Sequence, residues 1–450
     1  MKLTFLGGAK MVTGSQYLLE ANDGTRVLID CGLHQGSNFC ERHNWEPFLF
    51  EPSSVNAVFV THAHIDHVGR LPSLVRGGFT GEIFSTAPTR DIAHLSLLDS
   101  DHVLARDAER FNLPMLFDDA DVEQVSSLWK IVEYHTRVSV GPFTATFFNA
   151  AHILGSAFIL IEVDGKRIVF SGDLGNAPAP LIGSWELPPE ADVVLVESTY
   201  GGRVHEALPE RKELLRSLIT DTVKRGGTLM IPAFAVERTQ EILFELHDLS
   251  EKGFIPRIPI FLDSPLAIRM TEIYLKYSSF LTREAKTRSP GEKHPLFEFP
   301  GLRKTLRTEE SKAINDVAPP KVIIAGSGMS HGGRILHHER RYLSDPNSML
   351  LVVGYQAKGS LGRALLDHAP TVKIFGEDVP VRARIKAIGG YSAHADQPQL
   401  LRWLSGFTGT KTEAYVVQGE IDEATALKEK IERDLKLRVS IPTEGSEVVL

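Results

Sequence analysis

The strongest constraint on the fold comes from residues 61–67, with the sequence THAHIDH, which follow an apolar strand. This segment places three imidazoles and one carboxylate within a few residues. Zinc binds neutral imidazole nitrogen and carboxylate oxygen at about 2.0–2.2 Å. Such a pattern should arise by composition alone in on the order of one chain in a thousand, so a solvated loop that happens to be rich in histidine is the weaker interpretation. The segment predicts a metal site, and other strands must bring further ligands to it.

The spacing within this segment favours two metal ions. His62 and His64 are two residues apart on extended backbone, so their side chains point the same way. Asp66 and His67 lie a turn further on, on a separate edge of the loop. A single tetrahedral ion could hardly use all four side chains and still keep a position open for water. We therefore expect a dinuclear site.

Length and composition are those of an ordinary protein with several domains. A chain of 450 residues is too long for one core and indicates two or three domains. No apolar run approaches the roughly 18 residues of a membrane span, and the opening MKLTFLGG looks like a strand rather than a signal peptide. Cys31 and Cys40 provide no disulfide framework. We expect a cytoplasmic protein without a membrane partner.

The charge distribution says little about partners. The net charge of −8 argues against nucleic acid, whose phosphates are bound mainly by Lys and Arg. Residues 201–380, however, hold 26 Lys and Arg against 22 Asp and Glu, whereas the rest of the chain holds 23 against 35. A small excess of this kind is usually a solvated surface, so it favours a nucleic-acid partner only slightly.

The order of predicted elements indicates an α/β protein with an inserted domain. Short strands open the chain, and the fourth of them, at 57–61, leads into the histidine-rich segment. From about residue 205, helices, including one expected over 266–286, alternate with short buried strands, as in a parallel sheet covered by helices. Strands then return near the end. We expect a first domain built from residues 1–205 and 381–450 and an inserted domain of residues 206–380.

Two further strand ends carry candidate metal ligands. His152, in AAHILGS, follows an apolar strand and precedes a glycine turn, and Asp173, in SGDLG, follows the second strand of a predicted hairpin. Taken alone, His152 would more often be a buried core histidine and Asp173 a turn carboxylate. Together with the segment around His62, the metal interpretation becomes the stronger one.

These motifs resemble a known family. THAHIDH, AAHILGS and SGDLG, in this order behind FLGGAKMVTGSQYLLE, look like the metallo-β-lactamase superfamily. LVESTYGG at 195–202, PAFAVERTQE at 232–241, AGSGMSHGGR at 325–334 and YSAHAD at 391–396 are similar to the β-CASP nucleases, most of all to the RNA-processing branch that includes the cleavage and polyadenylation specificity factor endonuclease. The resemblance covers nearly the whole chain. It implies a metallo-β-lactamase αββα sandwich with an inserted β-CASP domain, a parallel sheet flanked by helices.

The resemblance also implies roles for the candidate ligands. It assigns a first zinc to His62, His64 and His152, a second zinc to Asp66 and His67, and a bridging position to Asp173. Such a pair would lower the pKa of a bridging water from about 15.7 toward about 7. The resulting hydroxide would attack a phosphorus of RNA in line and leave a 5′-phosphate and a free 3′-hydroxyl.

Two more residues complete the implied catalytic group, which also includes Asp66. His394 would be the second-sphere acid that stabilises the pentacovalent phosphate or protonates the leaving oxygen. Glu197 would orient His394 through a carboxylate–histidine hydrogen bond. Without the resemblance, a histidine at a helix N-terminus and a glutamate at a strand end would be the preferred interpretations.

A glycine-rich segment, residues 326–333, is the expected phosphate site. It lies between a buried strand and a helix, where backbone N–H groups and a helix N-terminus favour an anion. The candidate contacts are Ser327, Gly328, Met329 and Ser330. Arg238 and Arg334 could add charge-assisted contacts. The alternatives are a simple tight turn for the glycines and salt bridges for the arginines.

The last family motif departs from its pattern at Gln418. The resemblance predicts a histidine here that completes the second zinc site, but the chain reads YVVQGE at 415–420. An amide carbonyl is a much poorer zinc ligand than imidazole, so we expect a weakened second site. Three explanations compete: an active enzyme whose second metal is looser or is coordinated through water at Gln418, a catalytically feeble binding subunit, and an introduced substitution. The other motifs are intact, so an active enzyme ranks above a binding subunit.

The sequence thus predicts a cytoplasmic zinc-dependent ribonuclease with two zinc ions per chain. It would act in RNA processing or decay as an endonuclease, a 5′-exonuclease or both. Single-stranded RNA is the expected substrate, because a narrow cleft between domains would admit a strand more easily than a duplex. A homodimer is left open. The alternatives are a weakly active or inactive RNA-binding subunit and a metallo-hydrolase of small esters or lactones.

Overall fold

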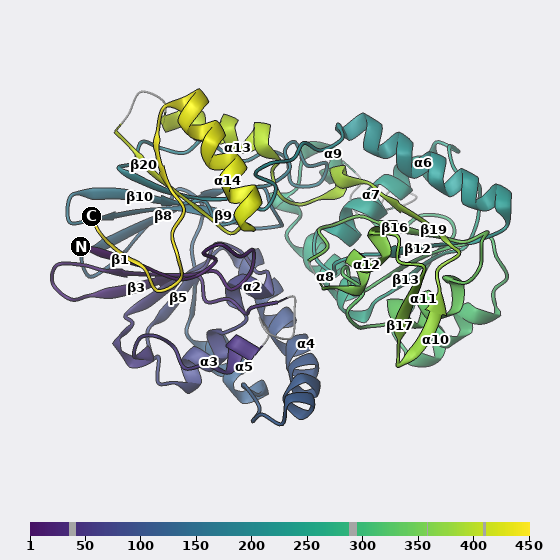
Figure 1. Ribbon diagram of the computed structural model, residues 1–450, viewed down its shortest axis with the longest axis horizontal. Coiled ribbons are helices and arrows are strands. Elements are labelled where there is room, and N and C mark those ends of the chain that lie inside the picture. Colours follow the sequence, from purple (N-terminus) through teal and green to yellow (C-terminus); the bar gives the residue numbers. More distant parts are fainter. Residues whose placement is uncertain (36–41, 288–294, 358, 408–410) are drawn as a thin grey trace. The chain divides into compact units, whose positions relative to one another are not determined.

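The computed structural model describes residues 1–35, 42–287, 295–357, 359–407 and 411–450 (Figure 1). These residues form two compact units. Unit 1 consists of Met1–Val204 and His394–Leu450, and unit 2 consists of His205–Ala393. Within the described residues, no helix is long and apolar enough to cross a membrane. Cys31 is a buried free thiol, and Cys40 lies outside the described residues.

Two seven-stranded sheets form the centre of unit 1. The strands of the first sheet, in spatial order, are β22 (Glu447–Val449), β1 (Lys2–Gly7), β2 (Gln16–Glu20), β3 (Arg26–Ile29), β4 (Ala57–Phe59), β5 (Glu82–Ser85) and β6 (Trp129–Ile131). Those of the second sheet are β21 (Arg438–Ser440), β20 (Glu413–Val417), β11 (Val193–Glu197), β10 (Lys166–Phe170), β9 (Ala157–Val163), β8 (Phe143–Asn149) and β7 (Arg137–Val140).

An apolar core fills the space between these two sheets. Phe5 and Phe59 of the first sheet belong to the same buried cluster as Phe147 and Phe170 of the second. Burying one such side chain contributes roughly 1.5–3 kcal/mol. Every second residue of each strand therefore faces this core, and the opposite face of each sheet needs its own cover.

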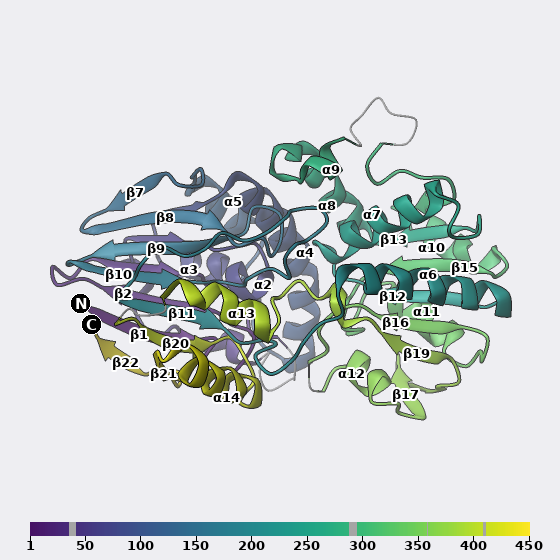
Figure 2. The same cartoon turned by 90° about the horizontal axis from the view of Figure 1, so that it is seen from above.

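Helices cover the outer faces of both sheets. The helices of unit 1 are α2 (Ile65–Val68), α3 (Leu71–Arg76), α4 (Ala87–Phe111), α5 (Asp119–Ser127), α13 (Gln397–Leu404) and α14 (Ile421–Lys430). Trp403 of α13 and Leu427 of α14 pack in one cluster with Phe158 and Val194 of the second sheet. Figure 2 shows α13 and α14 in front of that sheet, with α3 behind. The predicted αββα layering is confirmed.

The site is positioned by strands that end at one edge of these sheets. Strands β3 and β4 run parallel, as do β10, β11 and β20. The carboxyl ends of parallel strands meet at the same edge of a sheet, where ligands commonly bind. The polar residues at these ends are Asp30 after β3, His62 after β4, Asp173 after β10, Glu197 in β11 and Gln418 after β20.

Unit 2 is built on a six-stranded parallel sheet. In spatial order its strands are β14 (Leu302–Lys304), β13 (Ile260–Asp263), β15 (Lys321–Ala325), β12 (Thr228–Pro232), β16 (Met349–Val352) and β19 (Arg384–Ala387). A separate hairpin consists of β17 (Thr371–Ile374) and β18 (Glu377–Pro380). The helices are α6 (Leu208–Arg225), α7 (Arg238–Glu251), α8 (Pro265–Lys276), α9 (Arg283–Lys286), α10 (Thr308–Ala313), α11 (Ile335–Tyr342) and α12 (Leu361–Leu366). One face of the sheet packs on α11 and α12 through Ile335 and Leu365.

Two details of unit 2 differ from the sequence-based expectations. The helix expected over 266–286 ends at Lys276, where Tyr277 leaves the helical conformation, and a new helix begins at Arg283 because Thr282 Oγ1 accepts a hydrogen bond from Ala285 N. Unit 2 also runs past residue 380 to Ala393, since β19 pairs in parallel with β16 and thereby belongs to its sheet.

Candidate metal centre

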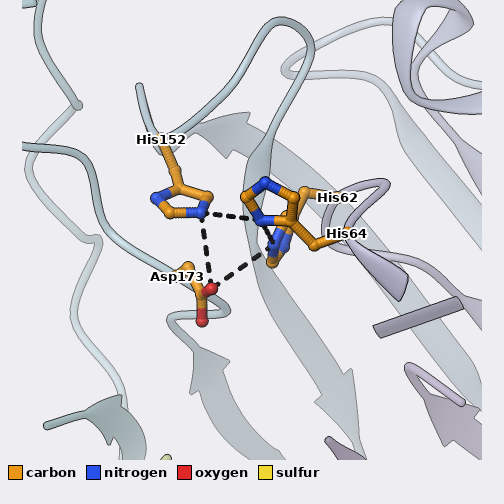
Figure 3. A group of neighbouring side chains, drawn as sticks. All are labelled: His62, His64, His152 and Asp173. Carbon is orange, nitrogen blue, oxygen red and sulfur yellow. Dashed lines mark hydrogen bonds and ion pairs between the residues drawn. The ribbon is translucent and has the colours of Figure 1, made fainter. Parts of the chain in front are cut away.

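Four side chains of unit 1 converge on one point. We call His62, His64, His152 and Asp173 the three-histidine group, whose possible ligand atoms all lie within 4.8 Å of one another (Figure 3). His64 Nδ1 is 3.0 Å from His62 Nε2 and 3.1 Å from His152 Nε2. Asp173 Oδ2 lies 3.4 Å from each of those two Nε2 atoms. Three nitrogens and one carboxylate oxygen are a set that zinc takes.

The electrostatics of this group favour neutral imidazoles. Burial, with the nearby charges of His62 and His394, lowers the pKa of His64 and of His152 well below the ordinary value. A neutral imidazole has a lone pair on one ring nitrogen, and this is the form that binds metals. The neutral forms of His64 and His152 can therefore each offer a ring nitrogen to a metal ion.

Tight backbone turns bring these ligands together. Ser156 Oγ accepts a hydrogen bond from His152 N at 2.9 Å and so closes the loop that carries the histidine. Gly172 has φ +51°, and a Cβ there would lie 2.7 Å from Thr61 Cβ. Only glycine allows the chain before Asp173 to approach the histidine-rich segment this closely.

A second group of side chains shares Asp173 with the first. We call Asp66, His67, Asp173 and Gln418 the second group. While Asp173 Oδ2 faces the three histidines, its Oδ1 lies 3.4 Å from His67 Nε2, which in turn is 4.0 Å from Asp66 Oδ2. Burial raises the pKa of Asp66, whereas His67 and His62 outweigh burial and hold the pKa of Asp173 well below its usual range. The carboxylate of Asp173 thus stands between two sets of possible ligands.

Asp30, which the sequence analysis missed, contacts the Nδ1 side of the His67 ring. Asp30 Oδ2 is 2.7 Å from His67 Nδ1, and Thr61 donates its N–H and its hydroxyl to the same carboxylate at 2.8 Å each. A carboxylate on Nδ1 fixes the ring so that Nε2 faces the second group. The sequence does contain a signal for Asp30. This aspartate directly follows the apolar strand 26–29, and the same pattern, a polar residue after an apolar strand, identified Asp173.

Gln418 reaches the second group with its side-chain amide. The side chain is 1 % exposed, and its Nε2 lies 2.8 Å from Asp173 Oδ1 and 2.8 Å from His67 Nε2. Asp173 and Asp30 outweigh burial and raise the pKa of His67 well above the ordinary value. The ring of His67 therefore lies between two carboxylates, with Asp30 at Nδ1 and Asp173 at Nε2, and its Nε2 also contacts the amide of Gln418.

His394 and Glu197 form a pair beside the three-histidine group. Glu197 is fully buried, accepts a hydrogen bond from Leu174 N at 2.6 Å and lies 3.0 Å from His394 Nδ1. His394 Nδ1 is also 3.8 Å from Asp173 Oδ2. Against the effect of burial, the carboxylates of Glu197 and Asp173 raise the pKa of His394 to about 9. The imidazole is therefore positively charged at neutral pH.

The predicted phosphate residues belong to unit 2, where their polar groups are largely engaged. Ser327 Oγ accepts hydrogen bonds from His331 N and Gly332 N, and Ser330 Oγ donates to Glu339. The loop also receives hydrogen bonds at its carbonyls: Gly328 O accepts from Gln356 and Met329 O from Gly362 N. A phosphate would have to displace the N–H contacts within the loop.

The two candidate arginines are salt-bridge partners. Arg238 is 3 % exposed and donates to Glu241 at 2.7 Å. Arg334 donates to Asp263 at 2.8 Å and to the carbonyl oxygens of Thr305 and Leu306. Both side chains therefore form the salt bridges that the sequence analysis gave as the alternative, and a phosphate contact of either arginine stays a prediction.

Comparison with known proteins places the chain in a family. Three family descriptions match: "Metallo-beta-lactamase superfamily" over residues 10–216, "Beta-Casp domain" over 239–365 and "Zn-dependent metallo-hydrolase RNA specificity domain" over 378–442. The chain is 41 % identical over 427 residues to "Ribonuclease TTHA0252" of Thermus thermophilus, with 95 % of each chain covered. It belongs to the β-CASP ribonucleases of the metallo-β-lactamase superfamily.

More distant relatives agree with this family. The chain is 30 % identical to an "RNase J-like protein" of Methanocaldococcus jannaschii, over 99 % of this chain and 98 % of the relative. It is 29 % identical to "Transcription termination factor FttA" of Methanosarcina mazei, over 100 % of this chain and 72 % of the relative. A protein of unknown function from Enterococcus faecalis V583 shares the fold, with a TM-score of 0.56, 14 % identity and coverage of 100 % and 99 %. The predicted family and enzyme class are confirmed.

Proposed function

We propose that this β-CASP nuclease hydrolyses phosphodiester bonds of RNA with zinc held in the two groups of unit 1. The observation that carries the proposal is the position of Asp173, whose two carboxylate oxygens face different sets of ligands. The relative from Thermus thermophilus is named a ribonuclease, which supports RNA as the substrate. We further propose that unit 1 is the metallo-β-lactamase domain and unit 2 the inserted β-CASP domain.

The donor atoms fit the expected metal. His62, His64 and His152 would hold a first ion together with Asp173, and Asp66, His67 and Asp173 would hold a second beside Gln418. A bound divalent ion supplies a Lewis acid that lowers the pKa of water and accepts negative charge from phosphoryl oxygens. The chain's own part is to hold these ligands neutral or anionic and to keep their orientation through Asp30 and Ser156.

His394, oriented by Glu197, would donate a proton to the leaving 3′ oxygen. Held by Glu197 at Nδ1, His394 would stabilise an anionic phosphate or protonate the departing 3′ oxygen. Glu197, anchored by Leu174 N, holds Nδ1, so the proton to be delivered is the one on Nε2. The products would carry a 5′-phosphate and a free 3′-hydroxyl. Single-stranded RNA, endonucleolytic or 5′-exonucleolytic action, a cytoplasmic location and a homodimer belong to the same proposal.

Cleavage of 5′-end-labelled single-stranded RNA with added zinc or manganese tests this function. We expect wild type to cut and Asp66→Ala to lose most of the activity, because a metal ligand is removed. Asp422→Ala, on the exposed surface of α14, is the matched control and should cut like wild type.

A second candidate function, an RNA-binding subunit without activity, is favoured by Gln418 alone. If wild type and Gln418→His both bind the RNA and neither cuts it, the nuclease proposal fails. If the protein hydrolyses a small ester or lactone but leaves RNA intact, it is a small-molecule metallo-hydrolase.

A further inference from the structure

The chain returns from unit 2 to unit 1 immediately before His394. Unit 2 ends at Ala393, and His394 is the first residue of the second part of unit 1. Just upstream lies the short 3-10 helix η5 (Gly389–Tyr391). We call residues 389–395 the return segment. Because only two residues separate Tyr391 from His394, the contacts that hold η5 also restrict where the backbone of His394 can lie.

Helix α6 and the residues before it hold the backbone of the return segment at Gly390. Gly390 N donates to Glu206 Oε2 at 2.6 Å, and Arg211 Nη1 donates to Gly390 O at 2.7 Å. A Cβ at Gly390 would lie 2.9 Å from Glu206 O and 3.3 Å from Arg211 Cβ. The backbone therefore passes so close to α6 that a larger residue would have to shift it.

The side chain of Tyr391 anchors the return segment a second time. Tyr391 is fully buried, and its hydroxyl donates to Glu245 Oε2 of α7. The guanidinium carbon of Arg211 lies 4.4 Å from the centre of the Tyr391 ring, within the range of a cation–π contact. Arg211 Nε and Nη2 donate to Glu245 Oε1 at 3.1 and 2.6 Å. One carboxylate thus binds both the tyrosine and the arginine.

Arg211 and Glu245 belong to a buried charged group that also contains Arg238 and Glu241. Arg238 donates to Glu241 at 2.7 Å, Arg211 lies 3.6 Å from the same carboxylate, and all four side chains are at most 4 % exposed. Apolar side chains of similar volume often stabilise a fold as well as buried ion pairs do. What such pairs add is direction, because each hydrogen bond on Gly390 and Tyr391 requires one orientation of its donor.

Unit 1 holds the other end of the return segment. Ala395 N donates to Leu174 O at 2.7 Å, and Leu174 N donates to Glu197 Oε1 at 2.6 Å. The second oxygen of Glu197 lies 3.0 Å from His394 Nδ1. Unit 1 therefore binds the ring of His394 and the backbone that follows it, whereas unit 2 binds the backbone that precedes it.

We propose that Arg211 and Glu245 are positioning residues for His394, which they orient through Gly390 and Tyr391. The proposal rests on the proposed function for the role of His394, and it adds two residues of the inserted unit to the apparatus that places this side chain. A change in α6 or α7 would then alter the chemical step without removing any group that touches the substrate.

A double-mutant cycle on the full-length chain tests this proposal. Tyr391→Phe removes only the hydroxyl that Glu245 binds, and kcat for end-labelled RNA should fall about tenfold with KM and zinc content unchanged, since a small misplacement of a catalytic group slows the chemical step. In the His394→Ala background, the same change should lower kcat no further, because the ring that it misplaces is gone. Tyr274→Phe is the matched control, since it removes another buried tyrosine–glutamate hydrogen bond of unit 2, to Glu237, and it should keep the wild-type kcat.

Substitutions of Glu245 add a rescue by a conservative variant. Glu245→Ala removes the acceptor of both Tyr391 and Arg211, so kcat should fall further than in Tyr391→Phe, and Glu245→Gln, which keeps an acceptor oxygen, should restore part of the loss. Equal losses from Tyr391→Phe with and without His394 would overturn the proposal, and so would a wild-type kcat in Tyr391→Phe. Circular dichroism checks that each variant is folded. If Glu245→Ala does not fold, Tyr391→Phe decides.

A readout without RNA lets this proposal and the function fail separately. In protein labelled with ¹³C at histidine Cε1, the NMR signal of His394, assigned with His394→Ala, should shift in Tyr391→Phe and keep its wild-type position in Tyr274→Phe. If wild type leaves RNA intact but shows this pattern, the function fails and the orientation of His394 by unit 2 stands. If wild type cuts RNA and Tyr391→Phe changes neither the signal nor kcat, the function stands and the inference fails.

Discussion

Each unit has an aspartate–histidine cluster at the end of a strand with a parallel neighbour, and the two clusters differ in what surrounds the carboxylate. In unit 2, Asp263 receives hydrogen bonds from Arg334 at 2.8 Å and Thr305 Oγ1 at 2.6 Å, with His338 Nε2 at 2.7 Å. In unit 1, Asp173 lies among histidine nitrogens at 3.4 Å. Both clusters combine an aspartate with histidine, and in both the aspartate lies at the carboxyl end of a strand with a parallel neighbour.

The two clusters differ in the balance of donors and acceptors. Asp263 is surrounded by hydrogen-bond donors, and the guanidinium of Arg334 neutralises its charge, so the cluster is complete as it stands. Around Asp173, the described ion-pair partners are histidines, with no arginine or lysine among them. The aspartate of unit 1 therefore lies among side chains that can bind a metal, whereas that of unit 2 has a permanent cation, Arg334, as its partner.

The largest expected effect comes from making the same substitution in both clusters. Asp173→Asn should lower RNA cleavage by about a thousandfold, because loss of a shared ligand removes several kcal/mol of transition-state stabilisation. The variant should also retain less zinc after dialysis. Asp263→Asn should keep the wild-type zinc content. Equal zinc retention by both variants would break the comparison.

An intermediate effect is expected on the stability of unit 2. Asp263→Asn should lower the free energy of unfolding at pH 7 by about 3 kcal/mol, because it leaves the guanidinium of Arg334 without its counter-charge. The control Asp367→Asn, which breaks an exposed pair with Arg363, should cost about 1 kcal/mol or less. Urea unfolding followed by circular dichroism, with a chelator present, gives both values.

The same variant should also change the pH dependence of stability. Hydrogen bonds from His338, Thr305 and others outweigh burial and lower the pKa of Asp263 to about 2. A lowered folded-state pKa stabilises the fold above the unfolded value of about 4, and this contribution disappears as pH falls toward 2. Wild type should lose stability over that interval faster than Asp263→Asn. Parallel curves for the two proteins would show that Asp263 does not titrate as described.

The smallest effect concerns Glu339, a buried acid for which no salt bridge is present among the described residues. Burial raises the pKa of Glu339 to about 8, opposed by the hydrogen bond from Ser330. The unfolded chain releases this proton near pH 4.5 and the folded chain near pH 8, so stability falls as pH rises between these values. Glu339→Gln should abolish a loss of about 1 kcal/mol between pH 7 and pH 8. The exposed Glu309→Gln is the control and should unfold like wild type at both pH values.

Much of the site was predictable because its ligands follow strands. His62, His152 and Asp173 could be found from apolar runs that end in a polar residue, and the structure brings their side chains together. Such a pattern does not predict the orientation of a side chain. The sequence around Gln418 does not indicate that the amide nitrogen, rather than the amide oxygen, contacts His67, because this orientation depends on the neighbouring Asp173.

Unit 2 shows the same limit. The glycine-rich segment stays a predicted phosphate site, but its sequence does not indicate that Ser327 accepts hydrogen bonds from two of its N–H groups. The motif around Arg238 likewise left a phosphate contact and a salt bridge open, and the structure gives the salt bridge with Glu241. Local sequence indicates where backbone donors and charges occur, whereas their partners come from residues distant in the chain.

The interruption of unit 1 by unit 2 has a consequence for biosynthesis. Strand β20 pairs with β11, and its Gln418 completes the second group, but the ribosome makes β20 only after all of His205–Ala393. Until then, β11 is an open edge and the apolar residues that α13 and α14 later cover face water. A nascent nuclease therefore lacks His394 while the inserted unit is already free to fold. Its hydrolytic machinery is assembled late, when most of the polypeptide has left the exit tunnel.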